Sequence, residues 1–314
     1  MGIRSGDFAE TFAGKDVWDF HTDLRFLVDS AVEDPFLTEQ IDLSTAAKLN
    51  GVFTALGRLA DAPQEAHFEA LERDLGLIRE SEGLSVVLTR KDLEGVGRQL
   101  IHAEGVYFIE SESDLKHLEW LWDEGVRSVA PLYNEDNALG GGAKGDPARS
   151  LTDLGRAFLM QAWRTGFMVD CAHANHRTKS DMIDLALVTG HEMHYSHGYL
   201  DEAVSPIYGE RGLPRDMARR LIETGALIGL TPFPGFVGGF ERHLEEIEFL
   251  AEVAAHQVVL GSDFAGINSL FEEFKGIWGI GDFAERLSAV HGEDFVRSYC
   301  GGALKALLER SLPA

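Results

Sequence analysis

The sequence predicts a single α/β domain spanning residues 1–314, a (β/α)8 barrel of the TIM type. Eight short apolar runs, rich in β-branched and aromatic residues, alternate with stretches that have the apolar spacing of helices. No linker rich in Pro, Gly or Ser separates them, so the alternation indicates parallel strands in one continuous sheet. A closed barrel is the economical arrangement of eight such strands, and a doubly wound open sheet is the alternative.

The predicted strands occupy residues 17–23, 51–57, 99–104, 128–134, 167–173, 191–197, 226–232 and 257–263. A ninth apolar run, Ser85 to Leu88, must be peripheral for the count to be eight. Several helical stretches end in a glycine just before the next run, where a left-handed cap is expected, and these glycines are Gly125, Gly166, Gly190 and Gly225. The Gly-rich stretch 140–145 lacks the pattern of a phosphate loop, so we expect a flexible loop between a strand and a helix.

The amino-acid composition limits which classes of partner and which cellular compartment are expected for this protein. A formal net charge of −24 argues against nucleic acid, because a phosphate backbone would be repelled. A neutral or cationic small molecule fits better, although a local base such as Arg211 can hold a carboxylate. The two cysteines, Cys171 and Cys300, lie far apart in the sequence, which favours a reducing compartment over a disulfide framework. Residues 1–15 contain no stretch apolar enough for a signal peptide, and no run approaches the ~18 apolar residues of a spanning helix, so a cytoplasmic protein without a membrane partner is predicted.

Histidines and carboxylates recur at the carboxyl ends of the predicted strands, where barrels of this type carry ligands and catalytic groups. His21 and Asp23 end the first run and share a face, because residues i and i+2 of a strand point to the same side. The other candidates end later runs and are Glu104, His173, His197 and Asp263. Imidazole and carboxylate ligands without thiolates suit zinc, with manganese, cobalt or iron as poorer alternatives.

Two zinc ions ~3.5 to 4 Å apart would share Glu104 as a bridge and hold a hydroxide between them. His21 and Asp23 would then serve one ion, and His173 and His197 the other. Asp263 would take a proton from the attacking water and deliver it to the leaving nitrogen.

Other side chains compete for these roles. His197 is preferred to His194, because their odd separation puts His194 on the opposite strand face. His102 shares a face with Glu104 and could support the ligands from behind. Asp170 is buried by pattern and needs a partner. The histidines expected to be solvated or capping are His67, His117, His176, His243, His256 and His291.

Six segments in order resemble the signatures of the membrane (renal) dipeptidase family of zinc peptidases, namely 19–23, 103–105, 169–173, 195–197, 261–266 and 301–304. The resemblance implies an amidohydrolase-like barrel with a binuclear zinc site that cleaves dipeptides, in some members those with a D-residue at the carboxyl end. It also implies self-association, for which a homodimer is the simplest expectation. The metal ligands that it implies are His21, Asp23, Glu104, His173 and His197. By the same likeness Asp263 shuttles the proton, and Arg211 binds the substrate carboxylate through its planar guanidinium.

The sequence departs from the family pattern around the substrate. Tyr133 stands where members usually have a histidine that polarises the scissile carbonyl, and a hydroxyl can still donate to an oxyanion. Phe233 falls near where some members use a tyrosine to help hold the carboxylate, and a phenyl ring cannot donate that bond. The segment after His197 lacks the usual serine and carries extra residues before Arg211. We therefore expect metal binding to be retained and substrate recognition to be altered.

The predicted function is a zinc-dependent dipeptidase that acts through a metal-bridging hydroxide. One alternative is a metal-dependent amidohydrolase of the same fold acting on a non-dipeptide or cyclic amide, which Tyr133 and Phe233 favour. The other is a catalytically silent barrel that keeps its metals, and the presence of Asp263 argues against it.

Overall fold

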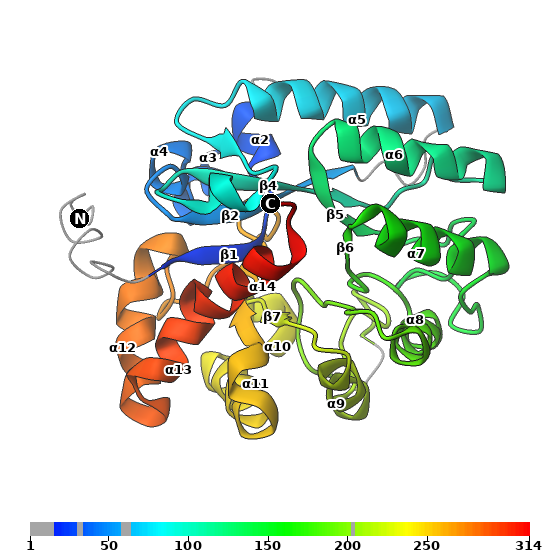
Figure 1. Cartoon of the computed structure of the whole chain (residues 1–314). Helices are drawn as coiled ribbons and strands as arrows, with labels where there is room; N and C mark the ends of the chain where they lie inside the picture. The colour runs from blue at the N-terminus through cyan, green and yellow to red at the C-terminus, as the bar shows by residue number, and fades with distance from the viewer. Residues whose placement is uncertain (1–15, 30–33, 58–63, 202–204) are drawn as a thin grey trace.

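The computed structural model describes residues 16–29, 34–57, 64–201 and 205–314. Parallel strands form an inner layer, and helices surround them (Figure 1). One ladder runs in the order β1 (Trp18–Thr22), β2 (Gly51–Gly57), β4 (Arg98–Glu104), β5 (Val126–Ala130) and β6 (Met168–Val169). A second pair joins β7 (Ile228–Leu230) to β8 (Val258–Leu260).

Isolated parallel bridges join these two ladders into a ring. Asp170, directly after β6, pairs with His194. Tyr195 pairs with Ile228 of β7. Thr22 at the end of β1 pairs with Phe264, which follows β8. The predicted α/β barrel is confirmed, and the ring rules out the open doubly wound sheet.

The predicted strand 191–197 is wrong as a regular strand, because bridges form only at His194 and Tyr195. The next N–H along, that of Ser196, donates to the side chain of Asp170 at 3.1 Å, so it is lost to the ladder. Other runs are shorter than predicted. In particular, β5 ends at Ala130, which places Tyr133 in the loop that follows rather than in the strand.

The ninth apolar run is peripheral, as the count of eight requires. Its strand β3 (Ser85–Val86) pairs with Arg98 and Gln99 at the start of β4, off the main path. Farther along, β4 pairs with β5 from Ile101 onward. β3 therefore lies at the amino-terminal end of the barrel, away from the predicted site.

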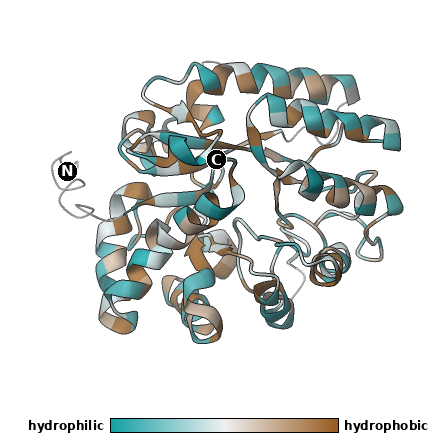
Figure 2. Cartoon of the chain, viewed as in Figure 1, coloured by the Kyte–Doolittle hydropathy of each residue, from teal (hydrophilic) through white to brown (hydrophobic). Residues whose placement is uncertain are grey.

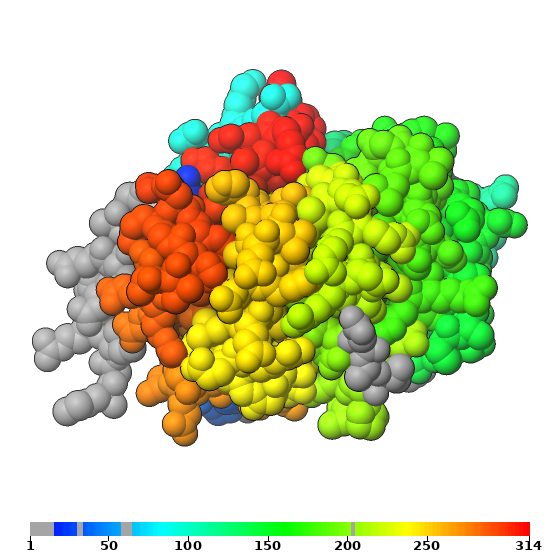
Figure 3. All heavy atoms as spheres, turned by 90° about the horizontal axis from the view of Figure 1, so that it is seen from below, coloured from blue at the N-terminus to red at the C-terminus, as the bar shows by residue number. Residues whose placement is uncertain are grey.

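Helices surround the strands. Those before β5 are α2 (Arg25–Val28), α3 (Pro35–Gln40), α4 (Leu43–Ala46), α5 (Gln64–Arg79) and α6 (His117–Asp123). Those after it are α7 (Asp153–Thr165), α8 (His176–Thr189), α9 (Arg215–Glu223), α10 (Pro234–Val237), α11 (Phe240–Ala254), α12 (Ile280–His291), α13 (Glu293–Arg297) and α14 (Ala303–Ser311). Figure 3 shows that the carboxyl-terminal half, coloured from green through yellow and orange to red, makes up one continuous face of the molecule. No helix in the described ranges is both long and apolar enough to cross a bilayer.

Local sequence signals explain where the helices beside the site begin and end. The hydroxyl of Thr152 accepts the N–H of Gly155 at the start of α7, and the side chain of Asn175 accepts the N–H of Thr178 at the start of α8. All four glycines predicted as caps have positive φ, with values of 89° at Gly125, 108° at Gly166, 71° at Gly190 and 89° at Gly225. The strands after three of these glycines begin at Val126, Met168 and Ile228, within two residues of the predicted starts, whereas the predicted run after Gly190 forms only the bridges at His194 and Tyr195.

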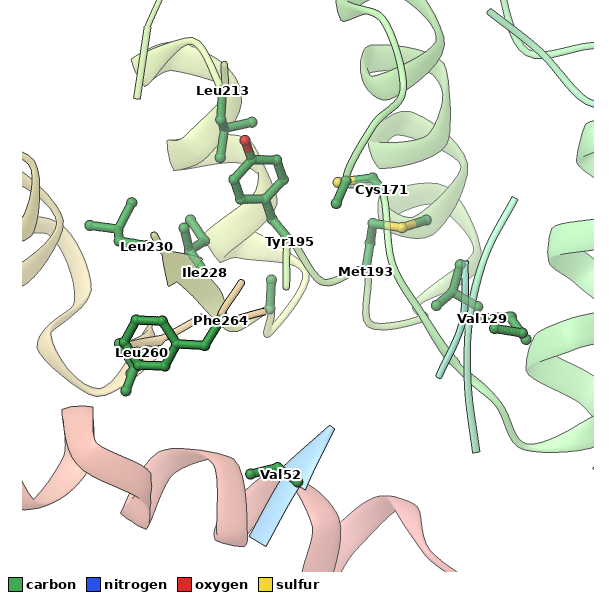
Figure 4. Packing of buried hydrophobic residues seen from close by; sticks show 14 of the residues in the cluster. Val52, Val129, Cys171, Met193, Tyr195, Leu213, Ile228, Leu230, Leu260 and Phe264 are labelled. Carbon is green, nitrogen blue, oxygen red and sulfur yellow. The ribbon is translucent and has the colours of Figure 1, made fainter. Parts of the chain in front are cut away.

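Apolar side chains fill the barrel on both sides of the strands. Inside its amino-terminal end, Trp18, Phe20, Phe53, Leu100 and Val259 pack together with Leu304, Leu307 and Leu308 of α14. This helix lies across the ring in Figure 1. A second cluster fills the space between strands and outer helices, and Figure 4 shows Tyr195, Ile228 and Phe264 grouped beside β7. Figure 2 shows hydrophilic and hydrophobic residues alternating along the outer helices. The opposite, carboxyl-terminal end is left for polar groups.

Candidate metal centre

The predicted histidines and carboxylates converge on Glu104, the last residue of β4. Its Oε1 lies 3.0 Å from His173 Nε2, 3.6 Å from His197 Nε2 and 3.9 Å from His21 Nε2. Asp263 Oδ1 lies 3.9 Å from His21 Nε2 on the other side. The carboxyl ends of β1, β4, β6 and β8 and the segment before β7 thus bring five predicted residues together.

Backbone conformation directs two of these side chains into the centre. His173 and Asp263 have φ of 64° and 57°, in the left-handed region that residues other than glycine rarely adopt. Neighbouring backbone holds both turns, because the His173 carbonyl accepts the N–H of Ala143 at 2.7 Å and the N–H of Asp263 donates to the His21 carbonyl at 3.0 Å. Strain of this kind is typical of functional sites.

Hydrogen bonds leave the Nε2 atoms of two histidines pointing inward. His173 Nδ1 lies 2.9 Å from Asn134 Oδ1, and His197 Nδ1 lies 2.8 Å from Ser196 Oγ. Burial, followed by the nearby His21 and Arg211, lowers the pKa of His197 well below its usual value. A neutral imidazole that donates through Nδ1 carries its lone pair on Nε2, the atom that binds metals. The two Nε2 atoms are 3.0 Å apart beside the Glu104 carboxylate, so this set of Lewis bases fits a cation such as zinc.

The donor atoms form three overlapping triads within which all ligand atoms lie within 4.8 Å of one another. They are His21, His102 and Glu104; His21, His197 and Asp263; and Glu104, His173 and His197. Asp23, a predicted ligand, belongs to none of these triads. Its N–H bonds to the Phe264 carbonyl at 2.8 Å, and its carboxylate lies beside Gly266 and Asp263, at the edge of the cluster.

The two competing histidines lie in different surroundings. His102 is buried and belongs to the first triad, and its Nδ1 lies 2.8 Å from Ser128 Oγ while its Nε2 lies 3.7 Å from Asp170 Oδ2. His194 points away from the centre, as its strand face predicts. Its Nδ1 accepts the N–H of Leu227, and burial lowers its pKa to about 3.

Tyr133 and Arg211 border the cluster, and Phe233 lies farther out. The Tyr133 ring centroid is 4.4 Å from that of His173. Arg211 Nη2 lies 3.2 Å from His173 Nε2 and 3.0 Å from the His197 carbonyl oxygen, to which it donates. Phe233 is buried against Phe236 at a ring distance of 4.8 Å, and the Phe236 ring lies 6.0 Å from Arg211 Cζ. The Phe236 ring thus contacts Phe233 and also lies near Arg211.

The Gly-rich stretch is a loop, as predicted, and hydrogen bonds tie it to the site. Ala143 donates its N–H to the His173 carbonyl and accepts the N–H of Glu210, both at 2.7 Å. Lys144 donates its N–H to the Asn134 carbonyl at 2.7 Å. The loop thus joins three segments, which carry Tyr133, His173 and Arg211.

Sequence reasoning did not find the residues that hold Arg211. Tyr195 donates its hydroxyl to the Arg211 carbonyl at 2.9 Å and accepts Arg211 Nη1 at 3.1 Å. Lys179 is fully buried, and its Nζ donates to the Gly212 carbonyl at 2.8 Å and to the Glu210 carbonyl at 3.3 Å. Burial lowers the pKa of Lys179 to about 7. In the sequence, the signal that could have identified Lys179 is its position on the barrel-facing side of a helix.

A closed α/β barrel with imidazoles and carboxylates converging at the carboxyl ends of its strands defines the class of metal-dependent hydrolases with an amidohydrolase-like fold. The sequence model of the membrane dipeptidase family, peptidase family M19, matches residues 46–305. The chain therefore belongs to the membrane dipeptidase family, as the resemblance in its sequence indicated.

Individual relatives are distant. An uncharacterised dipeptidase of Schizosaccharomyces pombe is 30% identical over 176 residues, which is 52% of this chain and 40% of that protein. A second uncharacterised dipeptidase of that yeast is 25% identical over 176 residues, or 41% of its length. The matched region is thus well under half of each of these two relatives.

Solved structures match over nearly the whole chain. The dipeptidase AC, a metallopeptidase of family M19, has a TM-score of 0.80 at 22% identity and covers 96% of this chain and 99% of its own. A metallopeptidase of Rhodobacter sphaeroides, liganded with a phosphinate mimic of the dipeptide L-Ala-D-Ala, has a TM-score of 0.77 at 22% identity, covering 95% and 99%. At this level of identity the likeness establishes the fold.

Proposed function

We propose that this protein is a zinc-dependent dipeptidase. The observation that carries the proposal is the position of Arg211, whose guanidinium lies directly beside His173 and the Glu104 cluster. In a dipeptide the scissile amide is only one residue away from the free carboxylate. An arginine that holds this carboxylate next to the centre would select substrates with a single residue after the scissile bond.

In this proposal His21 and Asp23 would hold one zinc ion, His173 and His197 would hold the other, and Glu104 would serve both. When bound, the ions would lower the pKa of a water molecule and polarise the scissile carbonyl. Asp263 Oδ1 lies 3.9 Å from His21 Nε2 with 13% of its side chain exposed, so it borders the cluster and remains open to substrate. We assign to Asp263 the transfer of a proton from water to the leaving nitrogen, and to Tyr133 a hydrogen bond to the carbonyl oxygen.

Dipeptides with a D-residue at the carboxyl end belong to the proposed substrate class. The support is the Rhodobacter sphaeroides neighbour, whose ligand mimics L-Ala-D-Ala, and the shared fold. In addition, the partly exposed carboxylate of Asp263 would attract the free ammonium group of a dipeptide.

The test compares the hydrolysis of L,L and L,D dipeptides with that of their carboxyl-terminal amides, with and without a chelator. We expect metal-dependent cleavage of the dipeptides and at least a tenfold lower kcat/KM for the amides, because Arg211 loses its ionic partner. Equal rates for acids and amides would contradict the role of Arg211. No cleavage of any dipeptide by fully metallated protein would contradict the proposed activity.

A non-dipeptide or cyclic amide is the second candidate substrate. Two observations favour it: Tyr133 lies against His173 in place of an imidazole, and the buried Phe233 offers no hydrogen bond near Arg211. Cyclic dipeptides and N-acyl amino acids in the same assay separate this candidate from the first.

We propose a cytoplasmic location, which is supported by two buried cysteines that form no disulfide, Cys171 and Cys300. The homodimer implied by the family resemblance stays a prediction, which sedimentation of the purified chain can test.

A further inference from the structure

Asp170 lies behind the metal centre and is 1% exposed. Its Oδ1 accepts the N–H of Ala172 at 2.9 Å and the N–H of Ser196 at 3.1 Å. Its Oδ2 accepts the hydroxyl of Ser196. One buried carboxylate therefore binds the segment that carries His173 and the segment that carries His197.

The bonds of Ser196 determine which nitrogen of His197 carries the proton. A serine hydroxyl has a single hydrogen, and here it is donated to Asp170. Ser196 Oγ can then act only as an acceptor toward His197 Nδ1, 2.8 Å away. His197 is thereby held with its proton on Nδ1 and its Nε2 lone pair directed toward Glu104.

The same carboxylate acts on His173 through the backbone. The bond from the Ala172 N–H closes a short turn immediately before His173, whose φ of 64° is unfavourable for a residue with a side chain. Fixing this turn sets the direction in which the His173 imidazole leaves the backbone.

We propose that Asp170 is a positioning residue that presets both histidines of one metal site, His197 through the hydroxyl of Ser196 and His173 through the turn at Ala172. The inference rests on the metal centre of the proposed function and adds to it two residues with no assigned role, Asp170 and Ser196. Groups that orient a ligating histidine typically change metal affinity 10- to 100-fold when they are removed.

The chain offers a matched control in Ser128. Like Ser196, Ser128 is buried and lies 2.8 Å from the Nδ1 atom of a histidine, in this case His102. His102 is not among the five proposed ligands, and within its own triad the proposed ligands are His21 and Glu104. Ser128→Ala therefore removes a similar buried hydroxyl from a similar bond without touching a proposed metal ligand.

The experiment measures zinc content and zinc affinity of the full chain by competition with a chromophoric chelator, for wild type, Ser196→Ala, Asp170→Asn and Ser128→Ala. We expect Ser196→Ala and Asp170→Asn to bind one ion as wild type does and the other 10- to 100-fold more weakly. Ser128→Ala should bind both ions as wild type does. The metal-free forms of wild type and Ser196→Ala should unfold within a few degrees of each other, because positioning of a ligand acts on the metal-bound state.

Three results would overturn the inference: wild-type affinity for both ions in Ser196→Ala, an equal weakening of both ions, or an equal effect in Ser128→Ala. If Asp170→Asn fails to fold, the zinc affinity of Ser196→Ala alone tests the inference. Wild-type protein that binds two ions and cleaves no dipeptide would contradict the proposed function and leave this inference intact. A wild-type protein that binds no second zinc ion would overturn the inference about Asp170.

Discussion

The carboxylates of Asp23 and Asp263 both lie beside Gly266, where a side chain would otherwise project. A Cβ atom at position 266 would lie 2.0 Å from Asp23 Oδ2 and 2.5 Å from Asp263 Oδ1. Both distances are too short for any side chain, so only glycine leaves room for the two acids. The pairing brings a proposed metal ligand next to the proposed proton carrier.

Gly266→Ala should weaken zinc binding and lower stability by about 1 to 3 kcal/mol, because the added methyl group forces one carboxylate away. Metal content and urea unfolding measure the two effects. Gly76→Ala in α5 is the control, since a Cβ there would meet nothing within 4 Å, and it should raise stability by about 0.5 to 1 kcal/mol. Unchanged zinc binding in Gly266→Ala would contradict this prediction, because it would show that the two carboxylates can move apart without weakening the metal site.

Asp263→Asn should lower kcat on dipeptides by roughly 10²- to 10⁴-fold, because an amide cannot carry the proton from water to the leaving nitrogen. Zinc content should stay near that of wild type, since Asp263 is not a proposed ligand. Steady-state kinetics and elemental analysis of the same sample test both statements. Survival of activity would refute the proton-transfer role, whereas loss of an ion would make Asp263 a ligand.

Tyr133→His should raise kcat/KM on simple dipeptides, because an imidazole beside His173 restores a donor of the kind that the family resemblance implies. The Tyr133 ring lies 4.4 Å from the His173 ring, so a smaller ring at this position reaches the same region. The readout is the ratio of kcat/KM for dipeptides to that for cyclic or N-acyl substrates. A ratio that does not rise would locate altered specificity near Arg211 and Phe233 instead.

Stability should fall as pH rises through the titration of Glu246 on α11. Burial raises the pKa of Glu246 from 4.5 to about 8, although its carboxylate accepts the N–H of Leu200. Between these values the folded chain binds a proton that the unfolded chain does not, so each pH unit costs up to roughly 1.4 kcal/mol. Glu246→Gln imitates the protonated acid and should be more stable than wild type at about pH 8, with the difference vanishing below about pH 4.5. Urea unfolding at several pH values measures this, and a difference that stays constant with pH would contradict the assignment.

The sequence predicts the barrel well because its signals are local. Apolar β-rich runs and capping glycines such as Gly125 and Gly166 place strands and helices without knowledge of the tertiary structure. The convergence of His21, Glu104 and His173 follows from the fold, because parallel strands end on the same side.

Features that depend on a distant partner were missed. Asp170 breaks the expected strand at Ser196 because a side chain competes with the backbone for an N–H, which no local pattern reveals. His243, expected to be solvated or capping, is fully buried near Phe271 and Phe283. Helical spacing from Phe240 places His243 on the buried face of α11, but a histidine does not contribute to a pattern of apolar residues.

Under the proposed function, bound metal enables this chain to hydrolyse dipeptides. The direct measurement is a titration of metal-free protein with zinc, in which dipeptide hydrolysis and bound zinc are followed in the same sample. The proposed function predicts that activity rises with bound zinc and levels off near two ions per chain. Full zinc occupancy without dipeptide hydrolysis, or hydrolysis that persists in the metal-free protein, would contradict it.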